Sequence, residues 1–178
     1  MSTPQLPLPV KLVISLFMRD KGLIRPAAEA LTDRFGGLDL VGPWFPFDFT
    51  KYYQVEMGSP LYRRMVAFEK LIPSEHLAQI KVETIKLEQC YLNIDGKRKI
   101  NIDPGYITQE RFVLATAKNF AHRIYLDQGI YADLTLIYTK GSFKPLPWTY
   151  PDYQEKKMHD YLERVRNKYL VTLKSGRV

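Results

Sequence analysis

The segment KLVISLFM (11–18) constrains the fold of this chain more than any other feature. It is a continuous apolar run that contains β-branched residues. A strand with one solvent-facing side would alternate apolar and polar residues, so an unbroken run indicates a strand covered on both faces. The chain has 178 residues, 46% of them hydrophobic, which suits one domain with a full-sized core and argues against intrinsic disorder.

Helix and strand patterns alternate after this run. Asp20 is placed to cap a helix over 22–35, which Gly36 and Gly37 end. The next segments are an irregular or edge strand (38–49), a connection with one helical turn (50–60), a strand (61–72), a helix (74–92) and a strand (98–103). This order is compatible with a ferredoxin-like βαββαβ core.

The rest of the chain adds strands and a last helix. Strand-like runs at 111–118, 122–127 and 130–139 predict an enlarged, mostly antiparallel sheet with helices on one face. Asp152 and Glu155 have capping-box spacing ahead of an apolar helical stripe. We therefore expect a single α+β domain over 11–178, with an added β-hairpin and a C-terminal helix, after an extended leader over 1–10.

The hairpin sequence KNFAHRIYLDQGIYAD (118–133) gathers titratable residues. If Gln128 and Gly129 form a two-residue turn, His122, Tyr131 and Asp133 lie on one face of the hairpin and Arg123 on the other. A carboxylate near an imidazole raises its pKa, which suits a general base or an anion-binding group. The alternative is a solvated face whose polar groups contact only water or each other.

Cationic side chains beside this hairpin suggest an anion site. Lys118 ends an apolar strand next to Arg123, and the arginine fork pairs with oxyanions in bidentate fashion. Alternatively, both side chains extend from the core to water. The segment PWTYPDY (147–153), with Thr149 and Tyr150, either walls a ligand pocket or covers the sheet rigidly, with Asp152 capping the last helix.

The segment DPGY (103–106) has the spacing of a type II turn, with proline second and glycine third. Asp103 then either caps this turn or projects from the strand end as a functional carboxylate. Asp103, Asp133 and His122 could hold a hard divalent ion, although their spacing does not require one. With a single cysteine and no HExxH motif, a zinc site is not expected.

Charge and composition narrow the partners and the location. The net charge of +7 favours anionic partners, although a lysine-rich surface explains it as well. A single cysteine excludes an intramolecular disulfide and fits a reducing compartment. No apolar run approaches the roughly 20 residues that cross a bilayer, and the first residues do not form a secretory signal, so we expect a cytoplasmic protein without a membrane partner.

Several motifs resemble those of a known family, the uncharacterised prokaryotic proteins catalogued as domain of unknown function 4416. They are FPFDFTKYY (45–53), EMG (56–58), NIDPGYIT (101–108), VLATAKNFAHRIYL (113–126), GIYADLTLIY (129–138) and PLPWTYPDY (145–153). The resemblance implies a compact single-domain protein and brings no established reaction. It also implies functional polar residues at Asp103, Lys118, His122, Arg123, Tyr131 and Asp133, where the last position is often Glu in similar sequences.

Three functions follow from these patterns. The first is binding, with hydrolysis or transfer as an extension, of a small anionic ligand that is phosphorylated or nucleotide-like. Lys118 and Arg123 would hold the anion, His122 with Asp133 or Asp103 would move a proton, and Tyr131 would orient the ligand or donate to it. The alternatives are a nucleic-acid-binding module that uses basic residues of the last helix and a non-catalytic adaptor. The sequence specifies neither a cofactor nor an oligomeric state.

Overall fold

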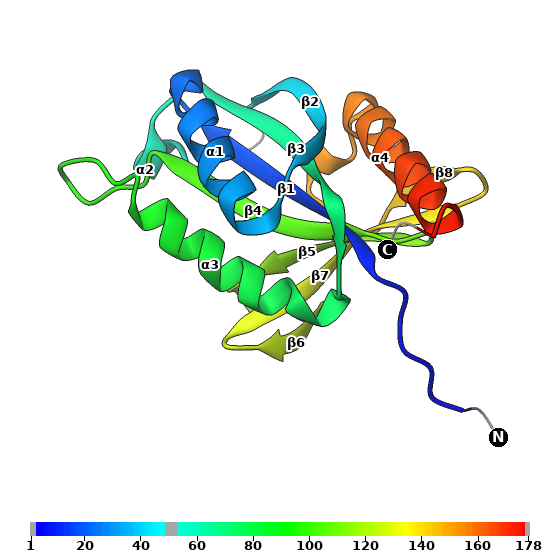
Figure 1. Ribbon diagram of the computed structural model, residues 1–178. Coiled ribbons are helices and arrows are strands. Elements are labelled where there is room, and N and C mark those ends of the chain that lie inside the picture. Colours follow the sequence, from blue (N-terminus) through cyan, green and yellow to red (C-terminus); the bar gives the residue numbers. More distant parts are fainter. Residues whose placement is uncertain (1–2, 49–52, 177–178) are drawn as a thin grey trace.

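The computed structural model describes residues 3–48 and 53–176, so parts of the predicted leader and of the segments 38–49 and 50–60 lie outside the described residues. Within these described residues, eight strands and four α-helices form an α+β fold (Figure 1). Their bounds are β1 (Val10–Met18), α1 (Ile24–Phe35), β2 (Leu38–Phe47), α2 (Gln54–Met57), β3 (Leu61–Ile72), α3 (Leu77–Gln89), β4 (Ile100–Ile107), β5 (Arg111–Thr116), β6 (Arg123–Asp127), β7 (Ile130–Thr139), β8 (Ser142–Pro145) and α4 (Lys156–Lys174).

The strands form one open sheet in which every pairing is antiparallel. The order is β2-β3-β1-β4-β5-β7-β6, with β8 also paired to β7. Strand β1 therefore lies inside the sheet, between β3 and β4, and β2 is an edge strand as predicted. The mostly antiparallel α+β fold is confirmed, whereas the ferredoxin-like assignment stays a prediction. The short strand β8 was not predicted.

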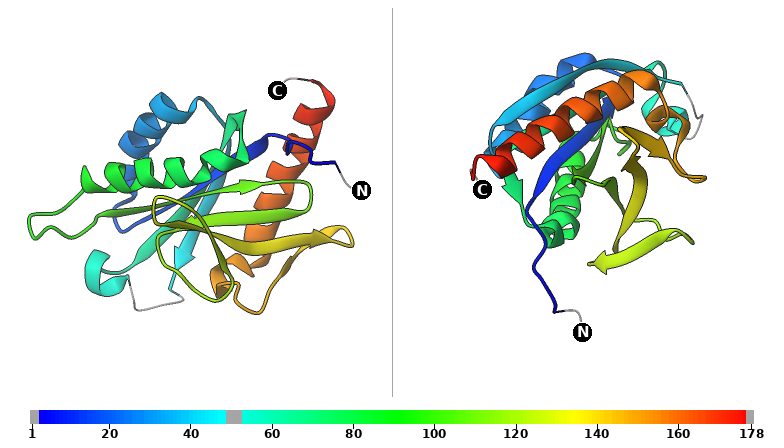
Figure 2. Two further views of the ribbon diagram at one scale, coloured as in Figure 1. Left: turned by 90° about the horizontal axis from the view of Figure 1, so that it is seen from below. Right: turned by 90° about the vertical axis from the view of Figure 1, so that its right-hand side faces the viewer.

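Helices cover both faces of the sheet. Leu12, Ile14 and Leu16 of β1 pack in one cluster with residues of α1 and α3, whereas Val13 packs in another with residues of α4. Because successive residues of a strand point to opposite faces, α4 lies on the face opposite α1 and α3 (Figures 1 and 2). The prediction of helices on one face is therefore wrong, and the prediction that 11–18 is covered on both faces is confirmed.

The predicted turn at 103–106 is wrong. Strand β4 runs without interruption from Ile100 to Ile107, and Pro104 and Gly105 both pair with β1. Glycine is required at position 105 by space rather than by turn geometry, because a Cβ atom there would overlap the carbonyl oxygen of Val113 on β5. Asp103 therefore projects from the middle of a strand and does not cap a turn.

The predicted helix cap at Asp152 is also wrong. Helix α4 begins after Glu155, whose side chain makes no cap hydrogen bond, and Asp152 lies in a preceding short 3₁₀ helix, Pro151–Tyr153. The Asp152 carboxylate is buried and forms an ion pair with Arg63 of β3. Because a carboxylate that is removed from water needs a partner, Asp152 pairs with Arg63 rather than with the backbone N–H groups at the start of α4. Among the described helices, none is both long and apolar enough to cross a membrane.

Candidate functional site

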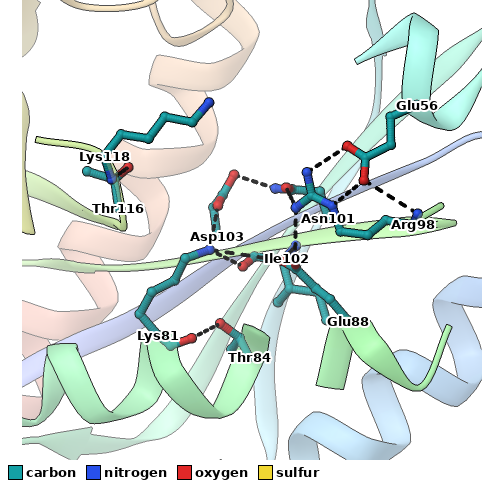
Figure 3. Close-up of polar contacts among 10 residues, drawn as sticks. All are labelled: Glu56, Lys81, Thr84, Glu88, Arg98, Asn101, Ile102, Asp103, Thr116 and Lys118. Atoms are coloured by element: carbon teal, nitrogen blue, oxygen red, sulfur yellow. Dashed lines mark hydrogen bonds and ion pairs between the residues drawn. The ribbon is translucent and has the colours of Figure 1, made fainter. Parts of the chain in front are cut away.

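A cavity of about 400 Å³ opens where β4 and β5 separate. The two strands pair only at Gly105–Ile107 and diverge beyond that point. If their register continued, Asp103 would stand opposite Thr116. Instead, Asp103 and the segment from Thr116 to Lys118 line the cavity from opposite strands (Figure 3). The divergence of two neighbouring strands thus creates room for a small molecule.

Charged and aromatic side chains line this cavity. The cations are Arg63, Lys81, Arg98, Lys118 and Arg123. The carboxylates are Glu88, Asp103, Asp133 and Asp152. The aromatic residues are Phe17, Phe47, Tyr53, Tyr150 and Tyr153. Such a lining, with convergent polar groups and aromatic walls, is typical of a ligand site.

Asp103 is held on both carboxylate oxygens. The Lys81 ammonium of α3 donates to Oδ1 at 2.8 Å and to the carbonyl oxygen of Ile102 at 2.9 Å. The Asn101 amide donates to Oδ2 at 2.6 Å (Figure 3). Burial alone would raise the pKa of Asp103, but Lys81, Arg63 and Asn101 together outweigh burial and hold the pKa below its ordinary value. Asp103 is therefore an oriented, ionised acceptor at neutral pH.

A second network fixes the beginning of β4. Arg98 donates from Nε and Nη2 to the Glu56 carboxylate at 2.7 and 2.8 Å. It also donates from Nη1 to Glu88 at 3.0 Å and to the side-chain oxygen Oδ1 of Asn101 at 2.8 Å. The other Glu88 oxygen accepts the backbone N–H of Ile102 at 2.7 Å. Burial raises the pKa of Glu88. Because Arg98 orients Asn101, this network also fixes the position of the Asp103 carboxylate.

Arg63 is enclosed by aromatic rings. Its guanidinium carbon lies 4.8 Å from the ring centre of Phe47 and 4.7 Å from that of Tyr153, and the guanidinium pairs with Asp152. These contacts combine cation–π attraction with a buried ion pair. Burial raises the pKa of the Tyr153 phenol, so the hydroxyl stays neutral around pH 7. It can therefore donate or accept a hydrogen bond but carries no charge.

The hairpin turn is confirmed, but its predicted register is wrong. Gln128 and Gly129 have φ angles of 51° and 77°, and Asp127 pairs with Ile130. An irregularity between Tyr125 and Asp127 then shifts the pairing by one residue. Arg123 consequently stands directly opposite Asp133, which places it on the face of the carboxylate rather than on the other face.

Asp133 nevertheless contacts both Arg123 and His122. Its Oδ2 atom lies 2.9 Å from Arg123 Nε and 3.2 Å from His122 Nε2. Arg123 also donates from Nη1 to the carbonyl oxygen of Lys118 at 2.9 Å and from Nη2 to the Tyr150 hydroxyl at 3.3 Å. Arg123 therefore links the hairpin, the end of β5 and the segment after β8 into one wall.

Not all predicted site residues meet at the cavity. Those that line it are Asp103, Lys118, Arg123, Asp133 and Tyr150. His122, Tyr131 and Thr149 do not line it. The His122 ring stacks on Trp148, with the ring centres 4.9 Å apart, and the Thr149 hydroxyl donates to the carbonyl oxygen of Thr135 at 2.5 Å. These residues lie in the hairpin and its cover rather than in the lining of the cavity.

Other cavity residues were missed at the sequence level, chiefly Lys81, Glu88 and Arg98. One signal was available for two of them. Lys81 and Glu88 are seven residues apart and so share a helical face with apolar residues such as Leu77. Charged residues on the buried face of a helix need partners, and that requirement could have indicated a polar site.

The possibility of a divalent cation at Asp103, Asp133 and His122 gains no support from the geometry. Across residues 3–48 and 53–176, no group of three or more His, Cys, Asp or Glu side chains is arranged to hold a metal ion. Asp133 is occupied by Arg123 and His122, and Asp103 by Lys81 and Asn101.

Comparison with known proteins gives one match. The family model described as "Domain of unknown function (DUF4416)" matches residues 8–169. No curated protein and no solved structure matches the chain. The matched range includes every element from β1 to β8 and most of α4.

Proposed function

The chain belongs to this family of unknown function, as its motifs indicate, and we propose from its own cavity that it binds a small anionic ligand, phosphorylated or nucleotide-like. Lys118 and Arg123 are the residues that hold the anion. The observation that supports this is that both line one cavity with Asp103 and Lys81. The volume of about 400 Å³ lies within the range of small-molecule sites.

The rigidity of Arg123 supports its role in binding. Its guanidinium already contacts Asp133, the backbone of Lys118 and the hydroxyl of Tyr150, so its orientation is fixed before a ligand arrives. A guanidinium has five N–H donors, which leaves capacity for a ligand oxygen. A preorganised donor loses less side-chain entropy on binding than a free one does.

Hydrolysis or transfer would require a proton acceptor inside the cavity. Of the two candidates only Asp103 lines the cavity, and it is oriented on both oxygens, but its lowered pKa makes it a weak base. In this proposal His122 supports Asp133 from outside the cavity through their contact at 3.2 Å. The binding proposal does not depend on turnover.

A thermal-shift screen with nucleotides and sugar phosphates tests the proposal. A ligand present at 100 times its dissociation constant adds about 2.7 kcal/mol of stability, which is easily measured as a rise in Tm. We expect Lys118→Gln to reduce or abolish the shift. The matched control is Lys157→Gln, which removes the same charge from an exposed position on α4 and should leave the shift unchanged. Absence of a shift with every compound, or equal effects of the two variants, would reject the proposal.

The nucleic-acid alternative gains less support. Several basic residues of α4 are engaged within the chain rather than presented together. Lys156 pairs with Asp160, Lys168 with Asp39, and the Arg166 guanidinium lies 3.4 Å from the ring centre of Tyr138. A steep salt dependence of binding to mixed-sequence RNA or DNA would revive this alternative.

A further inference from the structure

We infer that the ligand carries a single anionic group together with a hydrogen-bond donor that binds Asp103, and is not a polyanion. This inference rests on the proposed function and specifies the class of ligand. The donor is an amine, an amide or the donor edge of a nucleobase. The argument has three parts: the balance of charge around the cavity, the accessibility of Asp103, and the position of Lys118 across from it.

Charges around the cavity are nearly balanced. Among the described lining residues there is one more cation than carboxylates. Four ion pairs join cations and carboxylates of the lining: Arg63 with Asp152, Lys81 with Asp103, Arg98 with Glu88 and Arg123 with Asp133. Glu56, just outside the lining, contributes a further negative charge beside Arg98. A di- or triphosphate would face these carboxylates with excess negative charge, which like-charge repulsion disfavours.

Asp103 is the most accessible of the lining carboxylates. Its side chain is 26% exposed, against 4% for Glu88, 8% for Asp152 and 9% for Asp133. Each of its oxygens accepts one hydrogen bond from the protein, and each carboxylate oxygen can accept about two. Acceptor capacity therefore remains on an ionised, oriented group that lines the cavity. An anion cannot use that capacity, whereas a donor can.

Lys118 lies across the cavity from this acceptor. It follows the end of β5, whereas Asp103 belongs to β4, and the two strands diverge between them. Figure 3 shows Lys118 and Thr116 on one side and Asp103 with Lys81 on the other. A ligand with an anion at one end and a donor at the other would match both sides at once. A ligand with an anionic group and a hydrogen-bond donor would also account for the presence of both cations and carboxylates around the cavity.

Isothermal titration calorimetry on the whole protein with matched compounds tests this inference. One pair is aminoethyl phosphate and ethyl phosphate, which differ in an ammonium group that supplies both hydrogen-bond donors and a positive charge. A second pair is adenosine 5′-monophosphate and ribose 5-phosphate, and the polyanions are adenosine 5′-triphosphate and inorganic pyrophosphate. In at least one pair we expect the compound with the donor to bind more tightly than its partner by about tenfold or more. The reason is that the partner compound cannot donate a hydrogen bond to the charged Asp103 carboxylate. The polyanions should bind no more tightly than the monophosphates.

Two variants attribute the preference to Asp103. Asp103→Asn should bring the affinities within a pair closer together by about tenfold, because the acceptor loses its charge. Asp127→Asn makes the same change at an exposed position in the hairpin and should preserve the preference. Circular dichroism verifies that each variant is folded. If Asp103→Asn does not fold, the compound pairs on the wild-type protein decide the matter.

The outcomes separate the inference from the proposed function. If the polyanions bind more tightly than the monophosphates, or the donor has no effect in either pair, the inference is rejected. The proposed function survives that result provided that Lys118→Gln still weakens binding. If no compound binds, both are rejected.

Discussion

A lysine buried on α3 controls the behaviour of Asp103. Lys81 donates to this carboxylate and to the backbone carbonyl beside it, and the lysine is buried rather than exposed to solvent. The pKa of Asp103 lies below its ordinary value, so the pair contributes stability above about pH 4, the ordinary pKa of an aspartate. This contribution disappears as the pH falls through the lower pKa of the folded protein.

Replacing Lys81 by Met should therefore destabilise the protein in a pH-dependent way. At pH 7 the variant keeps an ionised carboxylate without its partner, and we expect a loss of about 3 kcal/mol in the free energy of unfolding. Towards pH 4.5 the loss should shrink, because Asp103 can take up a proton in the variant. Urea denaturation at both pH values measures this. Lys86→Met, at an exposed position on the same helix, is the control, with an effect of at most about 0.5 kcal/mol. A loss that is equal at the two pH values would contradict the account.

Gly105 sets the closest approach of β4 and β5 just before the cavity opens. The sequence singles out this residue, but turn chemistry suggested the wrong reason, because a close contact between two strands leaves no local pattern. Contacts between distant residues such as Gly105 and Val113 are visible only in the folded structure.

Gly105→Ala should destabilise the protein by about 1–3 kcal/mol, because the added methyl group forces the two strands apart. Gly37→Ala is the matched control. A Cβ atom there would meet only the flexible end of Glu69, and we expect a change of less than about 1 kcal/mol. Differential scanning calorimetry of the two variants provides the comparison. If Gly105→Ala were as stable as the control, the close approach of β4 and β5 would not require glycine at position 105.

The hairpin of β6 and β7 shows which parts of an element a sequence determines. Gln128-Gly129 predicts the turn correctly, because positive φ angles favour few residue types. The irregularity between Tyr125 and Asp127 left no comparable signal, and it moved Arg123 to the face of Asp133. The imidazole and the carboxylate still meet, because His122 precedes the strand and reaches Asp133 from outside the ladder.

Asp133→Asn should weaken the hairpin. The pair formed with Arg123 is shielded from water on both sides, so we expect a loss of about 3 kcal/mol in the free energy of unfolding. Asp160→Asn is the control, since its pair with Lys156 is exposed on α4 and should contribute less than about 1 kcal/mol. Hydrogen exchange of the β6 and β7 amides would locate the effect. Equal losses for both variants would show that the buried Arg123–Asp133 pair contributes no more to stability than an exposed pair does.

Sequence patterns predict the elements of the whole molecule better than their arrangement. Hydrophobic periodicity gives α1, β3, α3 and the buried stripe of α4, because each depends on the nearest residues in the chain. The run at 11–18 already required cover on both faces, yet nothing local shows which helix supplies it. The cavity is harder still to predict, since it arises where β4 and β5 part and collects residues from elements far apart in the sequence. Asp103, Lys118 and Arg123 were predicted as polar candidates. Lys81 was missed although its place on the buried face of a helix was a signal, and Arg98 became visible only with the fold.

A crystal structure of the protein with its tightest-binding compound from the thermal-shift screen tests the central claim most directly. The account predicts electron density for the compound between β4 and β5, with its anionic group within hydrogen-bond distance of Lys118 or Arg123. Density for the compound only outside this cavity, for example along the basic surface of α4, would contradict the account.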